Sequence, residues 1–543
     1  MDGGSVTTEL TFEPRDDAEQ HEADLVVLGA GGTGIAAALA AAERGVRVVL
    51  LEKGNRPGGA AMFGATGFAA YESEAQRDAG ETFSARDAFH AITEYNRHRC
   101  NEKLVREIVG RSGDTVSWLA SHGLKTTLAE HDGAHHGLVT AQTGILTAHR
   151  EARTYHRYVS KFGGFKKMLA SFAEMGGVLL TETAATDLVT GQEGEILGIR
   201  AEKTDAGAPL STRTALSKEA EKDIASDENQ DPILVDISTR AVVVGTGGFV
   251  GDHDLVQRVL GSIPASEVHF TGERKAVGTG GKIAVAAGGV ADDDVALDIP
   301  AFTVPGRFSS RSLAVLANLP LLWVNRAGKR FVDEAVTYRF GHRGSAVQQQ
   351  GGQFWMILDS ATVERLATDG LPHLSPAEDH GAPLPPGTEG TPAQPQLVEA
   401  LGEAVDCGSA YMGTSVEELA GAVGFQAQEF AATVDRYNHA VETGRDEEFF
   451  SPEQVLQHGV SEGPFYAVKV VNTVRGTLGG IRIDERTRVL DAHSVPVPGL
   501  FAGGNEATGF YGGTYPQIDG LTLAFAFNSG RIAGEAAADY LAH

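Results

Sequence analysis

The stretch DLVVLGAGGTGIAAALAAAERGVRVVLLE, residues 24–52, decides the fold class. Its first five residues form an apolar run that is typical of a strand buried on both faces of a parallel sheet. The turn GAGGTG follows at residues 29–34, and residues 35–44 then predict a helix. Residues 46–51 predict a second strand, which an acidic residue ends. The order strand, GxGxxG turn, helix, strand and acid predicts a βαβ unit of the Rossmann type.

Each glycine of this turn has a physical role in binding a dinucleotide. Gly29 makes the tight turn, Gly31 lets the backbone approach a pyrophosphate, and Gly34 lets helix and strand pack closely. The N-terminus of the helix offers unpaired N–H groups and a positive dipole end to the phosphates. Glu52, directly after the second strand, is placed to accept hydrogen bonds from a ribose. The unit therefore predicts a bound dinucleotide.

The residues after Glu52 indicate which dinucleotide is bound. KGNRPGGAAMFGATGF, residues 53–68, is a long tract of small residues, whereas a simple NAD domain normally continues into another helix here. Such a tract suits a backbone that runs past a flat isoalloxazine ring. We therefore expect FAD, and we expect this tract to supply the cofactor-binding residues Lys53, Gly58, Gly59, Ala60 and Gly67.

Composition excludes several other classes of function. The chain has 543 residues with 45 Lys and Arg against 72 Asp and Glu, a formal charge of −27. Nucleic acids and anionic membrane surfaces select for basic patches, so neither is expected as a partner. The two cysteines, Cys100 and Cys407, cannot hold an iron–sulfur cluster, and no CxxCH haem motif occurs. His131, His135 and His136 lack the spacing of metal ligands, so no metal site is predicted.

The beginning of the chain shows no targeting signal. It lacks the basic segment and following apolar segment of a secretory signal peptide. The chain contains no stretch of 18 uncharged apolar residues, so no membrane-spanning helix is expected. We expect a soluble cytoplasmic protein in which residues 1–22 are mobile.

Several later motifs follow one another in a recognisable order. They are RAVVVGTGGF at 240–249, GTGGKIA at 278–284, VNRAGKRFVDE at 324–334, GGIRID at 479–484, PGLFAGGNE at 498–506 and GLTLA at 520–524. Together with the first unit, they resemble the flavoprotein family of soluble fumarate reductases, 3-ketosteroid Δ1-dehydrogenases and tricarballylate dehydrogenases. The resemblance covers about residues 23–300 and 320–540, and Gly281 stands where the family usually has an aspartate.

The resemblance implies an α/β fold with two domains. A Rossmann-like FAD-binding domain of the glutathione-reductase type would take residues 23–297 and 466–543. An inserted α+β cap, or substrate domain, would take residues 298–465. We expect the active site at the interface between these domains, where ligand sites commonly lie.

Further contacts with FAD follow from the resemblance. It places Glu506 near the ribityl chain and the backbone from Leu521 to Leu523 at the N1/C2 edge of the flavin. A helix begins there, and its positive end would stabilise the negative charge of reduced flavin. The matching glycine turns add the cofactor-binding residues Gly247, Gly504 and Gly520.

The tract after the second strand also bears on how FAD is attached. In membrane-bound relatives of this family, a histidine in that tract links covalently to the flavin. No histidine lies between Glu52 and Asp87 in this chain. We therefore expect non-covalent FAD.

The family's reaction is hydride transfer between flavin N5 and a carbon near a carbonyl or carboxylate, with proton exchange at the neighbouring carbon. It needs an acid or base on one side and a group that polarises the carbonyl on the other. In fumarate reductases, a histidine and an arginine hold a dicarboxylate, and an arginine of the cap donates the proton. In this chain, Gly476 replaces the histidine, Tyr515 replaces the arginine that holds the dicarboxylate, and Tyr338 replaces the arginine that donates the proton. Fumarate is therefore not the expected substrate.

Tyrosines are therefore the predicted catalytic residues. The tyrosine at position 515 is a point of resemblance to the ketosteroid dehydrogenases, in which a tyrosine hydroxyl near this loop helps to polarise a ketone. Tyr338 is then a candidate acid or base, with Arg339 beside it, and Tyr511 is a weaker alternative carbonyl donor. A tyrosine base needs a nearby cation, because its ordinary pKa is about 10.

We expect a dehydrogenase that acts on the CH–CH bond of a ketone or ketosteroid-like substrate. The first alternative is reduction of an activated alkene, such as an enone or an unsaturated acid. Arg339, Arg343 and Arg475 also leave room for a tricarballylate-type acid. A flavin-binding protein without turnover is the alternative from another class. The electron acceptor or donor is expected to be external, and no motif identifies it.

Overall fold

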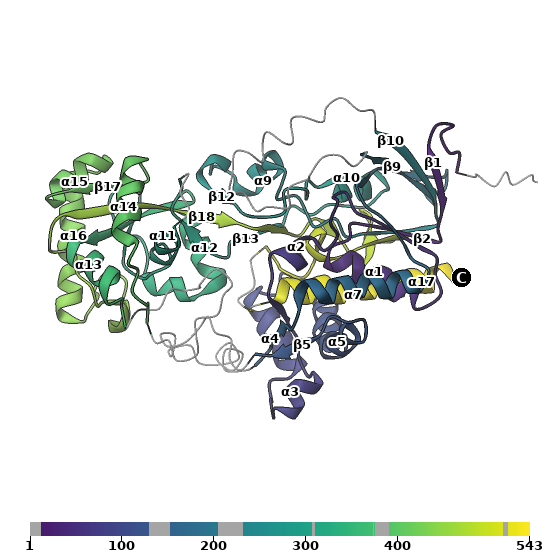
Figure 1. The fold of residues 1–543 in the computed structure, drawn as a ribbon, viewed down its shortest axis with the longest axis horizontal. Helices are drawn as coiled ribbons and strands as arrows, with labels where there is room; N and C mark the ends of the chain where they lie inside the picture. Colours follow the sequence, from purple (N-terminus) through teal and green to yellow (C-terminus); the bar gives the residue numbers. More distant parts are fainter. Residues whose placement is uncertain are drawn as a thin grey trace, which may run out of the picture.

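The computed structural model shows two lobes that lie end to end (Figure 1). The structure describes residues 12–129, 153–204, 232–306, 310–372, 374, 390–513, 518 and 520–543. We call the lobe with β2, α1 and α17 the FAD lobe and the lobe with α11 to α16 the cap lobe. Helices and sheets alternate in both, which confirms the predicted α/β class. The exact domain boundaries stay a prediction.

A six-stranded sheet forms the centre of the FAD lobe, in the order β21-β22-β11-β2-β3-β7. Its neighbours are parallel except for β21 with β22. The strands β2, β3 and β11 are buried at every residue, as the apolar runs predict. The strands are β2 Leu25–Leu28, β3 Val48–Leu51, β7 Val178–Leu180, β11 Ala241–Val244, β21 Arg488–Leu490 and β22 Pro496–Ala502.

Helix α1, Gly32–Ala42, lies beside the C-terminal helix α17, Leu521–Leu541 (Figure 1). Every residue of α1 is buried. A Cβ at Gly530 would lie 2.2 Å from the Thr33 carbonyl oxygen, and a Cβ at Gly534 would lie 2.2 Å from that of Ala37. The glycines of α17 and the alanines of α1 therefore let the two backbones approach closely.

A second sheet of the FAD lobe includes the chain's first described strand. Its order is β1-β10-β9-β8, with β1 Glu19–Glu22, β8 Thr183–Thr190, β9 Ile196–Lys203 and β10 Ile233–Ser238. Arg15 donates to the buried carboxylate of Asp236, with Nε 3.0 Å from Oδ1. An ion pair and a parallel strand pairing thus attach part of residues 12–22 to this sheet, and the mobility of residues 1–22 stays a prediction.

The tract after β3 leads into a small sheet in the order β4-β6-β5, with β4 Gly67–Ala69, β5 Thr126–Leu128 and β6 Tyr155–Tyr158. His156 of β6 is fully buried, with Nδ1 3.0 Å from the Thr154 oxygen and Nε2 2.8 Å from Ser73 Oγ. Burial lowers the pKa of His156 to about 4. The helices that precede, separate or follow these strands along the chain are α2 Gly59–Phe63, α3 Glu74–Asp78, α4 Ala85–Tyr95, α5 Glu102–Ser121 and α7 Lys161–Glu174.

The cap lobe is built on β18, Phe465–Val474, which runs from one lobe toward the other (Figure 1). Its partners are β12 His269–Phe270, β14 Phe302–Thr303, β16 Gln353–Asp359 and β17 Ala410–Gly413, and β15 Leu322–Val324 pairs with β16. Helices α11 Arg311–Leu316, α12 Phe340–Gln348, α13 Ser360–Thr368, α14 Leu397–Asp406, α15 Val416–Val423 and α16 Ala427–Thr443 cover the sheet.

A buried group of charges lies inside the cap lobe. The Arg330 guanidinium is 2.6 Å from Glu334 Oε2 and 2.8 Å from Asp446 Oδ2. All three side chains are at most 2% exposed. Burial raises the pKa of Glu334, and the hydrogen bond from Arg330 opposes that rise. Burial also disfavours the charged form of Asp446, but the Ser451 hydrogen bond and the charge of Arg330 lower its pKa to about 2.

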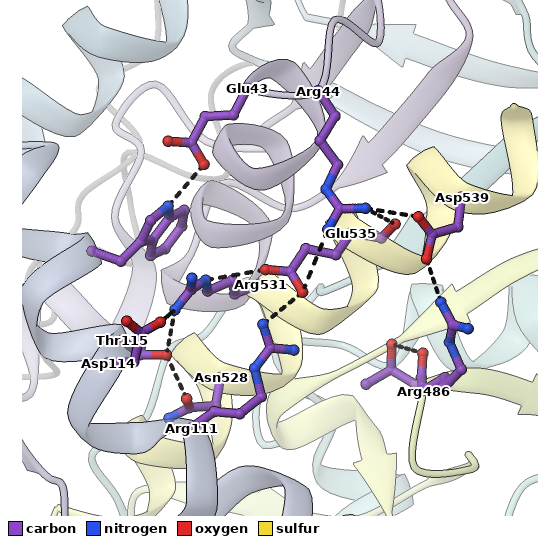
Figure 2. A network of polar contacts seen from close by, with 12 residues as sticks. Glu43, Arg44, Arg111, Asp114, Thr115, Arg486, Asn528, Arg531, Glu535 and Asp539 are labelled. Carbon is purple, nitrogen blue, oxygen red and sulfur yellow. Dashed lines mark hydrogen bonds and ion pairs between the residues drawn. The ribbon is translucent and has the colours of Figure 1, made fainter. Parts of the chain in front are cut away.

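A second charged network lies on the outside of α17 (Figure 2). Figure 2 shows Arg531 between Asp114 of α5 and Glu535 of α17, at 2.6 and 3.2 Å. Arg486 and Arg44 both contact Asp539. These ion pairs join the end of α1, α5 and the connection between β20, Ile481–Arg482, and β21 to the C-terminal helix. In the described part of the chain, no helix is both long and apolar enough to span a bilayer.

Candidate active site

The GxGxxG turn forms an open cradle at the start of α1. Gly29 has a φ of +93°, and a Cβ at Gly34 would lie 1.7 Å from the Gly29 carbonyl oxygen. A Cβ at Gly31 would meet no atom of the described residues within 4 Å, and Gly31 caps α1 without a side-chain hydrogen bond. The fold therefore requires glycine at 29 and 34, whereas Gly31 leaves space in front of the first N–H groups of α1. This space suits a pyrophosphate.

Glu52 lies at the end of β3, against this cradle. Its carboxylate accepts hydrogen bonds from the Ala30 and Gly54 N–H groups, at 3.2 and 2.7 Å. Lys275 Nζ lies 3.5 Å from Glu52 Oε1. Burial raises the pKa of Glu52, and the charge of Lys275 opposes that rise. Desolvation and the charge of Lys275 lower the pKa of Lys53. Lys275 was not among the residues that the sequence predicted.

The small-residue tract folds back onto the cradle. The Gly58 N–H donates to the Ala30 carbonyl at 2.7 Å, and a Cβ at Gly59 would lie 3.3 Å from Gly31 Cα. Ala60 follows in α2, and Gly67 begins β4, where it pairs with Arg157. The structure thus brings Gly58 and Gly59 to the turn, while Ala60 and Gly67 lie further along the tract.

Glu506 connects three turns of the FAD lobe. It is 3% exposed and accepts hydrogen bonds from the Thr246 hydroxyl and, at 3.0 Å, from the Gly248 N–H. A Cβ at Gly281, in the first turn of α10 Thr279–Ala286, would lie 3.2 Å from Glu506 Oε1. Burial raises the pKa of Glu506. The carboxylate therefore fixes the turn that contains Gly247.

Two more predicted glycines bring α17 and the turn before it to the cradle. A Cβ at Gly504 would lie 2.2 Å from the Thr33 hydroxyl, so the turn beside Glu506 contacts the start of α1. Gly520 has a φ of +76° and caps α17 without a side-chain hydrogen bond. A Cβ there would lie 2.7 Å from Phe68 Cα, which places β4 against the start of α17. Leu521 is buried and Leu523 is half-buried at this helix start.

A polar pair lies beside the residue that replaces the fumarate reductase histidine. Strand β13, Ala296–Asp298, pairs with β19, Gly476–Leu478, and Asp298 is opposite Gly476. Arg475 holds the Asp298 carboxylate with Nε 2.9 Å from Oδ2 and Nη2 3.3 Å from Oδ1. A Cβ at Gly476 would lie 3.2 Å from the Asn505 amide and 3.8 Å from Asp298 Oδ2. The missing side chain therefore faces a carboxylate and an amide.

Tyr511 packs close to the start of α17. Its ring is perpendicular to that of Phe525 in α17, with centroids 5.6 Å apart. Tyr511 is 2% exposed, and its hydroxyl has no hydrogen-bond partner among the described residues. Burial raises the pKa of Tyr511 well above its usual value, and the negative charge of Asp298 adds to the rise. The hydroxyl therefore keeps its proton and is available as a hydrogen-bond donor.

The cap lobe reaches this region through α12. The ring of His342 in α12 contacts Tyr95 of α4, with centroids 5.3 Å apart. Asn96, next to Tyr95, donates to the Phe510 carbonyl at 3.0 Å. Burial raises the pKa of Tyr95 to about 12. Sequence reasoning did not single out Tyr95 or Asp298, because only contacts distant in sequence bring them here.

The two catalytic residues predicted in the cap are Tyr338 and Arg339. Tyr338 is 4% exposed and packs in a hydrophobic cluster of the cap lobe with Trp355 and Tyr437. Arg339 joins two helices, and its carbonyl accepts hydrogen bonds from the N–H groups of His342 and Arg343. The structure thus does not bring Tyr338 to Tyr511, and the catalytic roles of Tyr338 and Arg339 stay predictions.

Two predictions lie outside the described residues. They concern Tyr515 and the cluster of His131, His135 and His136. In the described part of the chain, no three or more His, Cys, Asp or Glu side chains are placed to hold a metal ion.

The fold and the site define a class of protein. A βαβ unit with an open glycine cradle, a buried acid after its second strand and a cap that reaches the same region are features of a two-domain flavoprotein. The chain belongs to the FAD binding domain family, whose pattern matches residues 24–518. This match confirms the predicted cofactor, FAD, and the FAD-binding fold.

Named relatives resemble the chain over nearly its whole length. It is 29% identical to vinyl phenol reductase of Lactiplantibacillus plantarum, with 96% of this chain and 98% of that protein covered. It is 27% identical to 4-oxocyclohexanecarboxylate 2-dehydrogenase of Sinomonas cyclohexanicum, with 94% and 92% covered. The chain is an FAD-dependent oxidoreductase of the family that acts on CH–CH and C=C bonds.

A solved structure shows the same fold. It is 3-ketosteroid-Δ4-(5α)-dehydrogenase of Rhodococcus jostii RHA1 in complex with 4-androstene-3,17-dione. The TM-score is 0.66 at 21% identity, with 98% of this chain and 99% of that one covered. Together, these similarities confirm the resemblance that the motifs indicate.

Proposed function

We propose that the chain dehydrogenates a ketone, forming a C=C bond beside the carbonyl. The observation that carries this proposal is Tyr511, whose buried hydroxyl lies close to the start of α17 and has no hydrogen-bond partner among the described residues. A protonated hydroxyl in a dry site is a strong donor to a carbonyl oxygen. The cyclic ketone in the name of the Sinomonas relative supports the same substrate class.

The chain's own residues would act on two sides of the substrate. The first turn of α17 and the cradle would hold FAD, which would supply the hydride acceptor. Tyr511, with Tyr515 as its predicted companion, donates a hydrogen bond to the carbonyl oxygen. Tyr338 or Arg339 is the proposed acid or base that exchanges the proton at the carbon beside the carbonyl. The electron acceptor is external.

Reduction of an activated alkene is the second candidate function. It is supported by the similarity to a vinyl phenol reductase, whose name describes a C=C bond attached to a phenol. The same hydroxyl donor would then bind a phenol or enone oxygen. A tricarballylate-type acid has less support, because Gly476 and Tyr511 offer no positive charge for a carboxylate.

Anaerobic mixing of the oxidised holoenzyme with cyclic ketones, 3-ketosteroids and tricarboxylates tests the proposal. We expect a ketone to bleach the oxidised flavin, and we expect Tyr511→Phe to slow bleaching about 100-fold, the usual size for one lost donor. Tyr540→Phe, on the exposed end of α17, is the matched control. If no ketone bleaches the flavin, but an enone or vinyl phenol reoxidises the dithionite-reduced enzyme, the alternative is correct.

A further inference from the structure

The turn between α4 and α5, residues 96–101, lies against the loop at 509–513. Asn96 is 3% exposed, and its side-chain nitrogen donates to the Phe510 carbonyl oxygen at 3.0 Å. This carbonyl belongs to the peptide unit that joins Phe510 to Tyr511. Because a peptide unit is planar, a hydrogen bond that fixes its carbonyl also fixes the direction in which the chain enters Tyr511.

The same turn contacts the loop before and after Tyr511. The Asn101 N–H donates to the Gly509 carbonyl oxygen at 2.7 Å. Gly512 has a φ of +55°, and a Cβ there would lie 2.4 Å from the Arg99 carbonyl oxygen. These two contacts are made by main chain. The hydrogen bond to the Phe510 carbonyl is made by a side chain, so a substitution can remove it and leave the main-chain contacts in place.

The turn has a constrained backbone and lies where the two lobes meet. Arg97 and His98 have φ values of +53° and +57°, a conformation that is unfavourable for residues other than glycine. Such a conformation persists only where the surrounding structure imposes it, and it is concentrated at functional sites. Tyr95, directly before the turn, contacts His342 of the cap lobe. The turn is therefore a rigid support at the lobe interface.

We propose that Asn96 is a positioning residue, which orients the peptide unit before Tyr511 and so aims the Tyr511 hydroxyl at the substrate oxygen. The Tyr511 ring is perpendicular to the rings of Phe510 and Phe525, with centroids 5.1 and 5.6 Å apart. In this packing, a rotation of the backbone displaces the hydroxyl, because the ring has no room to compensate. The inference rests on the proposed function for the role of Tyr511, but not for the direction of the reaction.

A double-mutant cycle on the rate of flavin bleaching by a ketone tests the inference. We expect Asn96→Ala to slow bleaching about tenfold in the unmodified enzyme and less than about twofold in Tyr511→Phe. A merely structural role would slow both enzymes by the same factor, and that result overturns the inference. Asn96→Asp keeps the size of the side chain and replaces the nitrogen donor, so it serves if Asn96→Ala does not fold. If an enone is the substrate, reoxidation of the reduced flavin is measured in the same cycle.

A second measurement follows Tyr511 without turnover. With 3-fluorotyrosine incorporated at position 511 of the oxidised holoenzyme, we expect Asn96→Ala to shift the fluorine NMR resonance. Asn438→Ala is the matched control, because the Asn438 side-chain nitrogen also donates to a carbonyl, that of Val460, at 2.8 Å in the cap lobe. It should leave the resonance in place. An unchanged resonance in Asn96→Ala overturns the inference.

The two measurements separate this inference from the proposed function. If Tyr511→Phe is slowed but Asn96→Ala is not, the proposed function stands and the inference is overturned. If Tyr511→Phe reacts like the unmodified enzyme, the proposed function fails. A shifted resonance would then still support Asn96 as the residue that orients Tyr511, and an unshifted one would overturn that as well.

Discussion

Both lobes bury carboxylates, but they hold them in different ways. In the FAD lobe, Glu52 and Glu506 accept hydrogen bonds from backbone N–H groups of glycine-rich turns. In the cap lobe, Glu334 and Asp446 are held by one guanidinium, that of Arg330. The two buried acids of the glycine-rich turns are thus held mainly by main chain, whereas in the cap lobe a buried arginine adds to the backbone donors of Glu334 and Asp446. Asp236, elsewhere in the FAD lobe, is held by an arginine as well.

This difference teaches where each lobe is sensitive to substitution. A backbone donor is lost only when an added Cβ displaces it, whereas an ion pair is lost with either side chain. In the FAD lobe, we therefore expect the critical positions to be glycines that bind FAD or shape its site. In the cap lobe, we expect them to be charged residues that stabilise the fold. Five experiments test this comparison.

The largest effect is expected at the cradle. Gly34→Ala should prevent recovery of folded protein, because its Cβ would lie 1.7 Å from a backbone oxygen. Gly31→Ala has free space and an ordinary φ of −83°, so the apoprotein should keep its stability within about 1 kcal/mol. The new methyl should nevertheless weaken FAD binding at least about 100-fold, measured by fluorescence titration. A Gly31→Ala protein that binds FAD normally would contradict the assigned cradle.

The cap lobe should depend on its buried ion pairs. Arg330→Met removes the partner of two buried acids, and we expect a loss of about 3–5 kcal/mol in the free energy of unfolding. Lys329→Met breaks only an exposed pair with Glu429 and serves as the control. Chemical denaturation measures both. The FAD affinity of the folded fraction should stay unchanged. A large change in affinity would show that the buried ion pairs of the cap also support FAD binding.

Acid should destabilise the two lobes in different pH ranges. His156 in the FAD lobe has a folded pKa of about 4 against about 6.5 unfolded, so the unfolded state binds more protons as pH falls from 6.5 to 4. This linkage removes about 3 kcal/mol over that range. Asp446 in the cap lobe has a folded pKa of about 2, so its contribution is present above its unfolded pKa and is lost only as pH falls toward 2.

Denaturation midpoints between pH 7 and pH 3 check this order. His156→Asn should flatten the decline between pH 6.5 and 4, even if the variant is less stable at neutral pH. Asp446→Asn should leave that part of the profile unchanged and flatten only the decline below about pH 4. A single transition that neither variant alters would show that the acid sensitivity comes from other groups.

A smaller effect is expected at the acid after β3. Lys275→Met removes the cation 3.5 Å from Glu52, which raises the pKa of the buried carboxyl further and weakens its hydrogen bonds to a ribose. We expect about tenfold weaker FAD binding, or about 1.4 kcal/mol. Lys282→Met, on a lysine that is 67% exposed, should bind FAD like the unmodified protein. Equal FAD affinities for the two variants would show that Lys275 does not contribute to FAD binding.

The smallest effect should come from the outer network in Figure 2. Arg486 and Asp539 are 52% and 47% exposed, so water already screens their attraction. Arg486→Gln should change the free energy of unfolding by less than about 1 kcal/mol. Thermal unfolding of the holoenzyme measures this change. A larger loss would mean that the network, rather than the close packing of α1 on α17, holds the C-terminal helix.

Sequence alone predicted the parts of the site that are built from local pattern. The turn at 29–34, its flanking strands and Glu52 are set by glycine spacing and apolar runs within one segment, and the structure places them together. The motif order also predicted the FAD family. The glycines at 504 and 520 were found only through the resemblance.

The substrate side could not be predicted in the same way. Asp298 and Arg475 are 177 positions apart and carry no shared motif, so only the pairing of β13 with β19 joins them. Tyr338 shows a different limit: alignment gives its place along the chain but not the direction of its side chain, which packs into the cap lobe. His342 and Tyr95 meet only because two lobes touch.

The strand β18 belongs to the sheet of the cap lobe, and its last residues pair with β12, which precedes the cap lobe in the chain. Its alternate residues face opposite sides, with Val468 and Val470 in one apolar cluster of the cap lobe and Phe465 and Ala467 in the other. When domains are exchanged between proteins, the new domain is normally joined through a loop whose length can vary. Here a cap grafted from a relative must match the pleat of a strand, because one inserted residue would exchange the two faces. New substrate ranges should therefore arise more easily by changing loops on the existing cap than by replacing the cap whole.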